Sequence, residues 1–370
     1  MTVHEVKTDT RVPLVAAPST GHNRWHPAIA PAVRVSSGDT VVMRTRDGYD
    51  GQFDRNSTAE DVAAADMNRI HPLTGPVYVE DALPGDTLVV EVLDVDTGDF
   101  GCTLQFPGFG FLHEEFPGHH ITHWDIAEGY ATSPDLPGVA VKGAPFMGVM
   151  GVAPSAATLA TQNRLEAALA AEGHTVLLPD PVSAVPADPA IAPAARRTIS
   201  PTRLGGNVDI RQLTAGSRLH LPVEVEGALL SIGDGHFAQG DGESCGAAIE
   251  TRCTVTMRLT VRKGPEEIGP TGTCLVFEGV APETQDRQGS FVAIAGLPVK
   301  PGGDIDPENL NAATANALRG MIDFLGRERG LTRQQAYTLC SVAVDLRISQ
   351  IVDVPNVSVS AFLSLGVFTD

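Results

Sequence analysis

The sequence predicts a β-rich α+β protein, in which a β-sandwich-like body carries an appended α/β part. The first observation is the turn content, because 38 Gly and 27 Pro in 370 residues indicate many short strands. The second is the alternation of apolar and polar residues, which dominates the earlier part of the chain, whereas helical periodicity gathers late. We expect a mainly β part over residues 1–150 and an α/β part with the site loop over 151–370, folded as one integrated catalytic unit.

Composition excludes several classes of function. The net charge of −19 argues against nucleic acid and membranes as partners, and it fits a small neutral or cationic substrate. No apolar run approaches the ~18 residues that cross a bilayer, and the polar N-terminus shows no secretory signal. The 5 cysteines are scattered without a CxxC pair, which indicates reduced thiols. Together these features predict a cytoplasmic protein.

Two segments near the N-terminus share one pattern. Residues 32–47 predict a strand, a Ser-Gly-Asp turn and a second strand, and residues 75–98 predict a strand, a Pro-Gly-Asp turn and a strand. We interpret the later segment as a β-hairpin or the edge of a sandwich. Because Gly-Asp-Thr occurs in both, we expect related turns. Between the two segments, Ser57 or Thr58 is placed to cap a short helix.

Residues 100–124 are rich in Phe, Gly and His, and they lack the clean alternation of a strand. Aromatic loops of this kind often cover a small-molecule pocket, and the alternative is a hydrophobic loop docked on the core. His119, His120 and His123 have a spacing that suits a metal. A surface or subunit contact explains them equally well, so we assign them no ligand role.

The second half of the chain alternates between strands and helices. Residues 144–154 predict a buried strand, and residues 155–173 a helix whose leucines favour a core or subunit contact. Residues 247–263 predict a long alternating strand, and residues 306–330 an amphipathic helix. Thr332 and Gln335 form a capping-box pattern, which predicts a second helix through residue 350 that an Asp345–Arg347 ion pair would pin.

The most distinctive stretch runs from Gly227 to Glu250. An apolar run predicts a buried strand that ends at Gly233. We expect a loop after this strand, because glycines separate the polar residues that follow. Glycine lets the backbone take positive φ, so the polar side chains can converge on one point. These residues are Asp234, His236, Gln239, Asp241 and Glu243. Carboxylates beside an imidazole suit a divalent metal or acid/base chemistry.

Two other interpretations of this stretch compete. Gly-Asp pairs form polar turns, but a turn does not need His, Gln and Glu as well. A nucleotide-binding glycine loop would end in Lys-Ser or Lys-Thr, and the acids here would repel a phosphate. We therefore favour a site for a metal or for acid/base catalysis.

Two further segments carry candidate site residues. Asn207 and Asp209 follow a Gly-Gly pair, where Asn either closes a turn or lies in the active site. One strand separates them from the main stretch, so the two meet only if the chain between them folds back. His22 and Trp25 occupy a loop bounded by Pro31, and they either line a pocket or are ordinary loop residues.

The segment GDGHFAQGDGE followed by AIE resembles the signature of the acetamidase/formamidase family. The resemblance covers nearly the whole chain, since TGPVYVEDALPGDTLVVEVLD, GVMGVAP, LGGNVDIRQLTAGSRLHLPVEVEGALL and SVAVDLRISQIVDVP agree with it. It implies the β-rich fold of that family and hydrolysis of small amides to a carboxylate and ammonia. It also implies a divalent metal, zinc first and calcium second, and a homo-oligomer. GHNRWHP looks more like the formamidases, so we expect formamide first and acetamide second.

The resemblance also suggests roles for the candidate residues. The expected metal ligands are Asp234, His236 and Glu243. The expected catalytic residues, which move protons or hold the amide and the leaving ammonia, are Glu243, Asp241, Asn207 and Asp209. The residues expected to contact the substrate are Gln239, His22 and Trp25.

Several alternatives stay open. Glu250 either supports the site or pairs with Arg252 or Arg258. Cys245 lies inside the signature and is an alternative nucleophile, whereas no Gly-x-Ser-x-Gly pattern predicts a serine acyl-enzyme. A γ-lactam is also an amide, so lactam hydrolysis is a second hypothesis. An inactive metal-binding structural protein is the alternative of another class.

Overall fold

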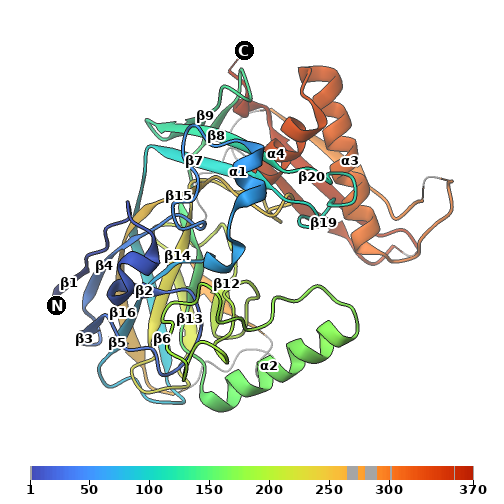
Figure 1. Ribbon diagram of the computed structural model, residues 1–370. Helices are drawn as coiled ribbons and strands as arrows, with labels where there is room; N and C mark the ends of the chain where they lie inside the picture. Colours follow the sequence, from blue (N-terminus) through green and yellow to red (C-terminus); the bar gives the residue numbers. More distant parts are fainter. Residues whose placement is uncertain (1, 265–273, 280–289, 301, 354, 370) are drawn as a thin grey trace.

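The computed structural model describes residues 2–264, 274–279, 290–300, 302–353 and 355–369, which form three β-sheets and four α-helices (Figure 1). A six-stranded sheet packs against one part of an eleven-stranded sheet as a sandwich. Another part of the large sheet carries a C-terminal layer of helices and a three-stranded sheet. The predicted β-rich α+β fold is therefore confirmed.

The six-stranded sheet takes strands from both halves of the chain. In spatial order it contains β1 (Val3–Val6), β4 (Thr40–Thr45), β16 (Cys253–Arg262), β6 (Thr87–Thr97), β13 (Arg218–Pro222) and β17 (Val276–Glu278). The central strand β16 pairs antiparallel with both β4 and β6. Its side chains alternate between buried and partly exposed, so the long alternating strand expected after residue 247 is confirmed for this segment.

The large sheet holds the functional region at its centre. Its main path contains β10 (Ala140–Lys142), β9 (Tyr130–Thr132), β8 (His120–Ala127), β7 (Phe100–Gln105), β15 (Glu250–Thr251), β14 (Leu230–His236), β11 (Phe146–Gly151) and β12 (Gly205–Asn207). Off this path, β5 (Leu73–Val79) pairs with β14, β2 (Gly21–His22) and β3 (Val33–Val35). Every residue of β11 is buried, as the sequence predicted for residues 144–154.

The sandwich is held together by apolar side chains that point inward from both sheets. Val41, Val90 and Met257 from the six-stranded sheet are fully buried against Leu230 and Ile232 from β14. Each such side chain removes apolar surface from water and contributes roughly 1.5–3 kcal/mol, because burial is worth about 25 cal/mol per Å².

The two Gly-Asp-Thr turns carry the chain from one sheet to the other. β3 and β5 belong to the large sheet, and the strands that follow them, β4 and β6, belong to the six-stranded sheet. The glycines have φ of 91° at Gly38 and 95° at Gly85. The following aspartates accept backbone N–H bonds from Ser36 and Leu83. The turns are thus related, but the hairpin expected over residues 75–98 is wrong, because its strands lie in different sheets.

Three helices follow the sequence closely. α1 (Ala59–Ala64) begins after Thr58, which forms a capping box with Asp61. α2 (Ala156–Ala171) and α3 (Leu310–Arg329) occupy the expected segments. α2 buries Leu159 but leaves Leu165 and Leu169 exposed, so the last two are not core residues. Figure 1 shows α2 at the edge of the sandwich, far from the C-terminal helices.

The last helix is shorter than predicted. α4 (Arg333–Ala343) begins with the expected capping box of Thr332 and Gln335, but β19 (Val344–Gln350) follows it directly. The prediction of a helix through residue 350 is therefore wrong. Asp345 contacts Arg347 at 3.2 Å, yet both lie on the strand. β19 joins β20 (Ser358–Ser364) and β18 (Phe291–Gly296) in the small sheet.

Short 3-10 segments complete the described elements: Leu14–Ala16, Pro18–Thr20, Met67–Arg69 and Leu365–Val367. Among the residues that the structure describes, no helix combines the length and apolar character needed to cross a membrane.

Candidate active site

A pocket of about 490 Å³ lies beside the C-terminal end of β14. Its walls are mainly apolar, and the wall residues are Tyr49, Met67, Ile70, Phe106, Pro107, Phe109, Leu177 and Ile199. Polar side chains also line it, namely His71, Asn207, Asp209, Asp234, Glu243 and Glu250. This combination of an apolar cavity and a few converging polar groups is typical of a small-molecule site.

The strand β14 carries Asp234 and His236 into this pocket region. The sequence predicted a loop after Gly233, but β14 continues through His236 and pairs with β11 and β15. That prediction is wrong because the sheet partners on both sides extend the strand. Asp234 has a φ of 59°, Asp209 of 46° and Glu243 of 43°. Such left-handed conformations of residues other than glycine cluster at functional sites.

The imidazole of His236 is oriented by Gln239 at Nδ1, so that Nε2 points toward the carboxylates of the site. Nδ1 donates a hydrogen bond of 3.0 Å to Oε1 of Gln239, whose Nε2 donates to the backbone oxygen of Asp209 at 2.9 Å. Nε2 of His236 lies 3.2 Å from Oε2 of Glu250 and 3.5 Å from Oδ2 of Asp234. Gln239 therefore orients His236 rather than lining the pocket.

Strand β11 brings the two polar segments of the sequence together. Its residue Val149 faces Asn207 of β12 on one side and Gly233 of β14 on the other. Nδ2 of Asn207 donates to Oδ2 of Asp209 at 2.9 Å. Asn207 and Asp209 consequently reach the same pocket as Asp234, and the fold-back that the sequence required is supplied by pairing to one shared strand.

Two glycines allow the carboxylates to approach the backbone. A Cβ at Gly148 would lie 2.6 Å from Oδ1 of Asp209 and 2.7 Å from Oδ2 of Asp234. A Cβ at Gly48 would lie 2.2 Å from Oδ1 of Asp234. No side chain fits at either position, so both glycines are part of the site.

Three pocket residues were missed or left open by the sequence. Glu250 lines the pocket and accepts from the Ala248 N–H at 3.0 Å, rather than pairing with Arg252 or Arg258. His71 and Tyr49 also line it, and Nε2 of His71 lies 3.8 Å from Oδ2 of Asp234. The sequence around His71 contains no pattern that predicts a site. Around Tyr49, the aspartates and glycines of residues 47–51 are the one local pattern that could have indicated it.

Asp241, a predicted catalytic residue, does not reach the pocket. Its carboxylate accepts from Nε2 of Gln212 at 3.2 Å, and its backbone N–H donates to Asp345. Asp345 also forms an ion pair with Arg211. These contacts fix the loop after Gly240 to β19, so Asp241 has a structural place in the fold.

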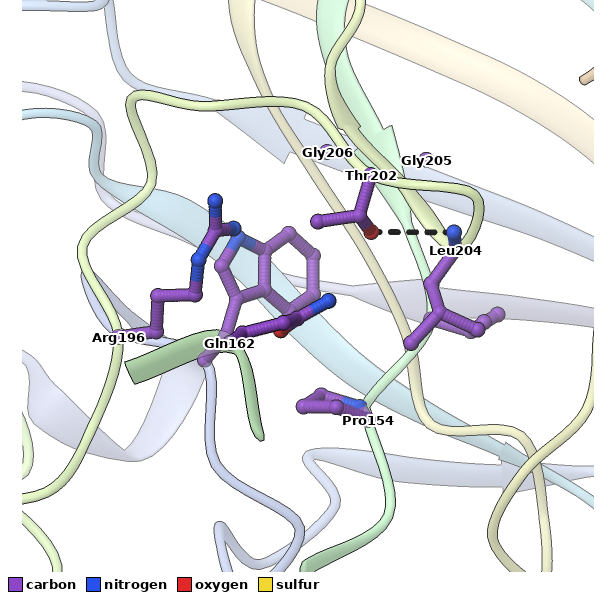
Figure 2. A pocket seen from close by; sticks show the side chains of 9 residues that line it. Pro154, Gln162, Arg196, Thr202, Leu204, Gly205 and Gly206 are labelled. Atoms are coloured by element: carbon purple, nitrogen blue, oxygen red, sulfur yellow. Dashed lines mark hydrogen bonds between the residues drawn. The ribbon is translucent and has the colours of Figure 1, made fainter. Parts of the chain in front are cut away.

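His22 and Trp25 also lie away from the pocket. The two nitrogens of His22 bond to the backbone oxygen of Arg24 at 2.6 Å and to Oγ of Ser231 at 2.7 Å. Burial lowers the pKa of His22 to about 4. Trp25 lines a separate, water-sized cavity together with Arg196 and Thr202 (Figure 2). The structure therefore does not bring these two residues to the candidate site.

The segment expected to be an aromatic loop is two strands with a loop between them. β7 and β8 pair over residues 100–127, and the loop that joins them supplies Phe106, Pro107, Phe109 and His119 to the pocket. The backbone N–H of Phe111 donates to the oxygen of Ser244 at 2.8 Å. This bond docks the loop beside Glu243. The loop therefore fits both interpretations left open by the sequence, because part of it lines the pocket while Leu112 and Phe116 are buried in a core cluster. His120 and His123 lie on β8.

The charges of the site are strongly coupled. Burial and the charge of Asp209 raise the pKa of Glu243, while burial and the charge of Asp234 raise the pKa of Glu250. Burial, together with Asp234 and Glu250, raises the pKa of Asp209. Burial disfavours the charge of Asp234 and of His236. Attraction to His71 and then His236 nevertheless lowers the pKa of Asp234, and attraction to Glu250 and then Asp234 raises the pKa of His236. The site therefore favours either bound protons or a cation.

The donor atoms fit a divalent metal. His236 groups with Asp209 and Asp234, and also with Glu243 and Glu250, with the donor atoms of each group within 4.8 Å of one another. Oδ1 of Asp209, Nε2 of His236 and Oε2 of Glu250 are buried without a hydrogen-bond partner. Buried polar atoms seldom lack partners, and imidazole with carboxylates is a donor set that zinc accepts. Of the three predicted ligands, Asp234 belongs to the first group, Glu243 belongs to the second, and His236 belongs to both.

Comparison with known proteins gives consistent matches. The family model described as acetamidase/formamidase family matches residues 7–370. A formamidase of Methylophilus methylotrophus is 33% identical over 94% of this chain and 89% of its own length. An acetamidase of Mycolicibacterium smegmatis is 35% identical over 86% of this chain and 84% of its own length. The solved structure of a gamma lactamase from Delftia acidovorans has a TM-score of 0.89 and 31% identity, and the match covers 99% of this chain and 94% of that one.

Proposed function

The chain belongs to the acetamidase/formamidase family and is an amidohydrolase, and we propose that it hydrolyses a small aliphatic amide, formamide first and acetamide second. The observation that carries the proposal is the convergence of unpartnered carboxylate and imidazole atoms in an apolar pocket. Hydrolysis needs an activated water and a proton for the leaving nitrogen, and such groups provide both.

We propose that a divalent metal, zinc first and calcium second, completes the site. His236 would hold it through Nε2, together with Asp209 and Asp234 or with Glu243 and Glu250. When bound, such a metal supplies Lewis acidity, which acidifies water and polarises a carbonyl oxygen.

The remaining chemistry belongs to side chains of the pocket. Asn207 uses Nδ2 to bond Asp209, so its unpartnered Oδ1 is the atom that accepts an N–H bond from the amide. Glu243 lines the pocket, and its raised pKa suits a group that takes a proton from water and passes it to the leaving nitrogen. The apolar walls exclude bulk water and strengthen these electrostatic interactions.

A second candidate substrate is a γ-lactam. Formamide has three heavy atoms, whereas the apolar pocket of about 490 Å³ has room for a ring. The structure with a TM-score of 0.89 is that of a gamma lactamase. Ile199→Trp separates the two substrates, because a larger side chain in the wall is expected to reduce kcat/KM for the lactam while sparing formamide.

The first test is product release before and after chelation. Ammonia from formamide and acetamide, and the new amine from a γ-lactam, are measured on one preparation. Loss of turnover with chelator and recovery with one metal is the expected result. Turnover that is indifferent to chelation would contradict the metal. Retained metal without turnover on any of the three would favour the inactive binding protein.

We also propose a cytoplasmic homo-oligomer. Cys102, Cys245, Cys253 and Cys340 are buried free thiols, which suits a reducing compartment. α2 exposes Leu165 and Leu169, and apolar side chains of this kind commonly lie at subunit contacts. Light scattering coupled to size-exclusion chromatography measures the subunit number.

A further inference from the structure

A second cavity, of about 410 Å³, lies on another side of Glu250. Its lining is mostly polar and consists of Thr10, Arg11, Asp47, Gly51, Phe53, Asp54, Arg55, Asn56, Asp99, Phe100, Cys102, Glu250, Thr251 and Arg252. Glu250 is common to the linings of this polar cavity and of the apolar pocket. Its Oε2 is buried and faces Nε2 of His236 at 3.2 Å, and its Oε1 accepts from the Ala248 N–H, so this carboxylate lies between the two cavities with one ionic and one backbone partner.

The wall between the two cavities is thin at the turn of residues 47–51. Asp47 and Gly51 line the polar cavity, whereas Tyr49 lines the apolar pocket. Between them, the backbone of Gly48 touches the site, because a Cβ there would lie 2.2 Å from Oδ1 of Asp234 and 3.2 Å from Oε2 of Glu250. Only backbone and the Glu250 side chain therefore separate the carboxylates from the polar cavity at this point.

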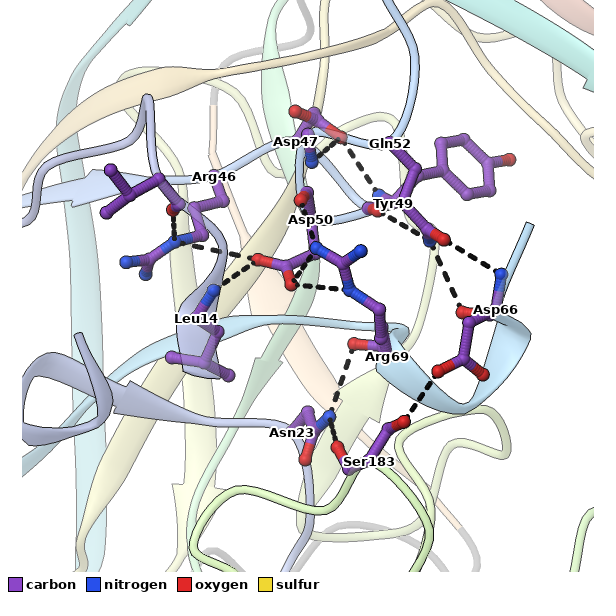
Figure 3. A network of polar contacts seen from close by, with 12 residues as sticks. Leu14, Asn23, Arg46, Asp47, Tyr49, Asp50, Gln52, Asp66, Arg69 and Ser183 are labelled. Carbon is purple, nitrogen blue, oxygen red and sulfur yellow. Dashed lines mark hydrogen bonds and ion pairs between the residues drawn. The ribbon is translucent and has the colours of Figure 1, made fainter. Parts of the chain in front are cut away.

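The turn itself is held by a network of hydrogen bonds and ion pairs, as Figure 3 shows. Oδ1 of Asp47 accepts from the N–H groups of Tyr49 and Gly51, each at 3.1 Å. Asp50 accepts from the Leu14 N–H at 2.7 Å and from the Arg69 guanidinium at 2.7 and 2.9 Å. The Glu250 side chain has fewer partners than the turn, namely the Ala248 N–H and Nε2 of His236, so it is the part of the wall that can move once its contact with His236 is released.

The two cavities suit different chemical species. Hydrolysis adds water across the C–N bond, and the proton of the new acid passes to ammonia, so the products are a carboxylate and ammonium. Asp47 and Glu250 present carboxylates at the wall of the polar cavity. Three arginines also line it: Arg11 pairs with Asp9, Arg55 pairs with Asp99 and Asp125, and Arg252 is the third, against the four carboxylates of Asp47, Asp54, Asp99 and Glu250. The apolar pocket, in contrast, has aromatic and aliphatic walls that suit the acyl group.

We propose that the polar cavity is a second opening of the active site, through which ammonium leaves after the Glu250 side chain moves aside. The inference rests on the proposed amide hydrolysis and on the ligand set of Asp209, Asp234 and His236, which leaves Glu250 outside the metal ligands. The amide enters and the carboxylate leaves by the apolar pocket, and the cation leaves past Asp47. Separating the two routes prevents a small cation from crossing an apolar mouth, where it would lose its hydration.

The experiment plugs the polar cavity chemically. Asn56 lines the cavity and is exposed, so Asn56→Cys can be labelled in the folded protein with a methyl or a benzyl methanethiosulfonate. We expect the methyl label to leave kcat unchanged and the benzyl label to lower it by about tenfold, because product release then limits turnover. Because kcat/KM does not depend on release, it is expected to stay the same while KM falls in proportion to kcat, and reduction with dithiothreitol should restore both.

A rapid-quench measurement distinguishes blocked release from a distorted site. With the benzyl label, carboxylate should form in a burst whose amplitude approaches the enzyme concentration, since chemistry remains fast. A slower rate without a burst, an increase in KM alone, or no change would each overturn the proposal. No turnover by the unlabelled enzyme would instead overturn the amidase function on which the proposal rests.

Two controls match this design. The wild-type chain has one exposed cysteine, Cys274, and the same labels there should change nothing. Leu177→Cys places the label at the apolar pocket, and the benzyl group there should raise KM without a burst. An identical response at Asn56→Cys and Leu177→Cys would mean that both cavities serve one route, which contradicts the inference.

Discussion

The two halves of strand β14 are equally buried but meet opposite requirements. Leu230 and Ile232 are each 0% exposed and pack into the sandwich core. Asp234 and His236 are 4% and 1% exposed, yet they carry charge, and Nε2 of His236 has no hydrogen-bond partner. One half gains free energy by leaving water, and the other loses it.

This difference separates stability from function along a single strand. The apolar half can be improved only by better packing, because its groups are already satisfied. The charged half stays costly until a metal or substrate supplies the missing partners. We therefore expect substitutions in the first half to change the free energy of unfolding, and substitutions in the second half to change turnover.

The largest effect is expected from Asp234→Asn. The change removes one charge and keeps the shape, and Asn tolerates the φ of 59° at this position. We expect kcat/KM to fall by about a thousandfold, because a carboxylate that we propose to bind the metal is lost. The melting temperature of the metal-free protein should fall as well, because the attraction of His71 and His236 lowers the pKa of Asp234 and the ionised carboxylate therefore stabilises the fold. Calorimetry measures the stability, and amide kinetics per folded molecule measure the turnover; a wild-type kcat/KM per folded molecule would break the distinction between the halves.

Gly148→Ala tests the same half without removing a charge. The new methyl group would lie 2.6 Å from Oδ1 of Asp209 and 2.7 Å from Oδ2 of Asp234, so the carboxylates must move. We expect kcat/KM to fall by about a hundredfold, as small displacements in an active site do. Gly118→Ala is the matched control, because a Cβ there meets nothing within 4 Å. Equal kinetics in the two variants would contradict the role of Gly148.

Leu230→Ala tests the apolar half. Removing a fully buried leucine from the sandwich core should lower the free energy of unfolding by about 2–5 kcal/mol. Turnover per folded molecule should stay at the wild-type value, because Leu230 does not line the pocket. Denaturant unfolding gives the first quantity, and kinetics at low temperature give the second. A selective loss of kcat would show that the halves are coupled.

Much of the fold could be predicted because its signals are local. The alternation of apolar and polar residues predicted β16, and the repeated Gly-Asp-Thr sequence predicted two related turns. Local patterns cannot show which sheet a strand joins, so residues 75–98 suggested a hairpin. The end of α4 was missed for a similar reason. Residues 344–350 have no breaker before them, and only pairing with β20 makes them a strand.

The candidate site was predictable only where it is contiguous. Asp234, His236 and Glu243 lie within one stretch of sequence, and the structure brings all three to the polar part of the site. Tyr49 and His71 arrive from distant segments through sheet pairing, which a single sequence does not reveal. Gln239 and Asp241 occur in the same stretch but have other contacts. Gln239 bonds to His236, and Asp241 bonds to Asp345 of β19. Spacing along the chain therefore predicted the cluster but not the role of each member.

The β-sandwich should show a pH dependence of its stability that does not involve the active site. The Thr2 N–H and His4 donate to Asp39 at 2.7 and 3.0 Å in the first Gly-Asp-Thr turn, and these bonds lower its pKa from 3.8 to about 2. A lowered pKa stabilises the fold above the unfolded value, and this stability is lost as pH falls through the folded value. The difference in melting temperature between wild type and Asp39→Asn should therefore be present at neutral pH and shrink between pH 3.8 and about 2. A constant difference across that range would contradict it.

The smallest effect is expected from Cys245→Ala, which lies beside the charged half but belongs to a core. Its thiol is buried and points toward the backbone oxygens of Leu104 and Ala247, at 3.6 and 3.7 Å. Burial raises the pKa of Cys245 to about 12, so the thiol stays protonated and is a poor nucleophile at neutral pH. We expect kcat/KM to change by less than about threefold, with a loss of stability near 1 kcal/mol from the small cavity. A loss of turnover comparable to that of Asp234→Asn, in a folded and metal-loaded variant, would replace activated water by a thioester route and extend the functional half of the strand into the loop that follows it.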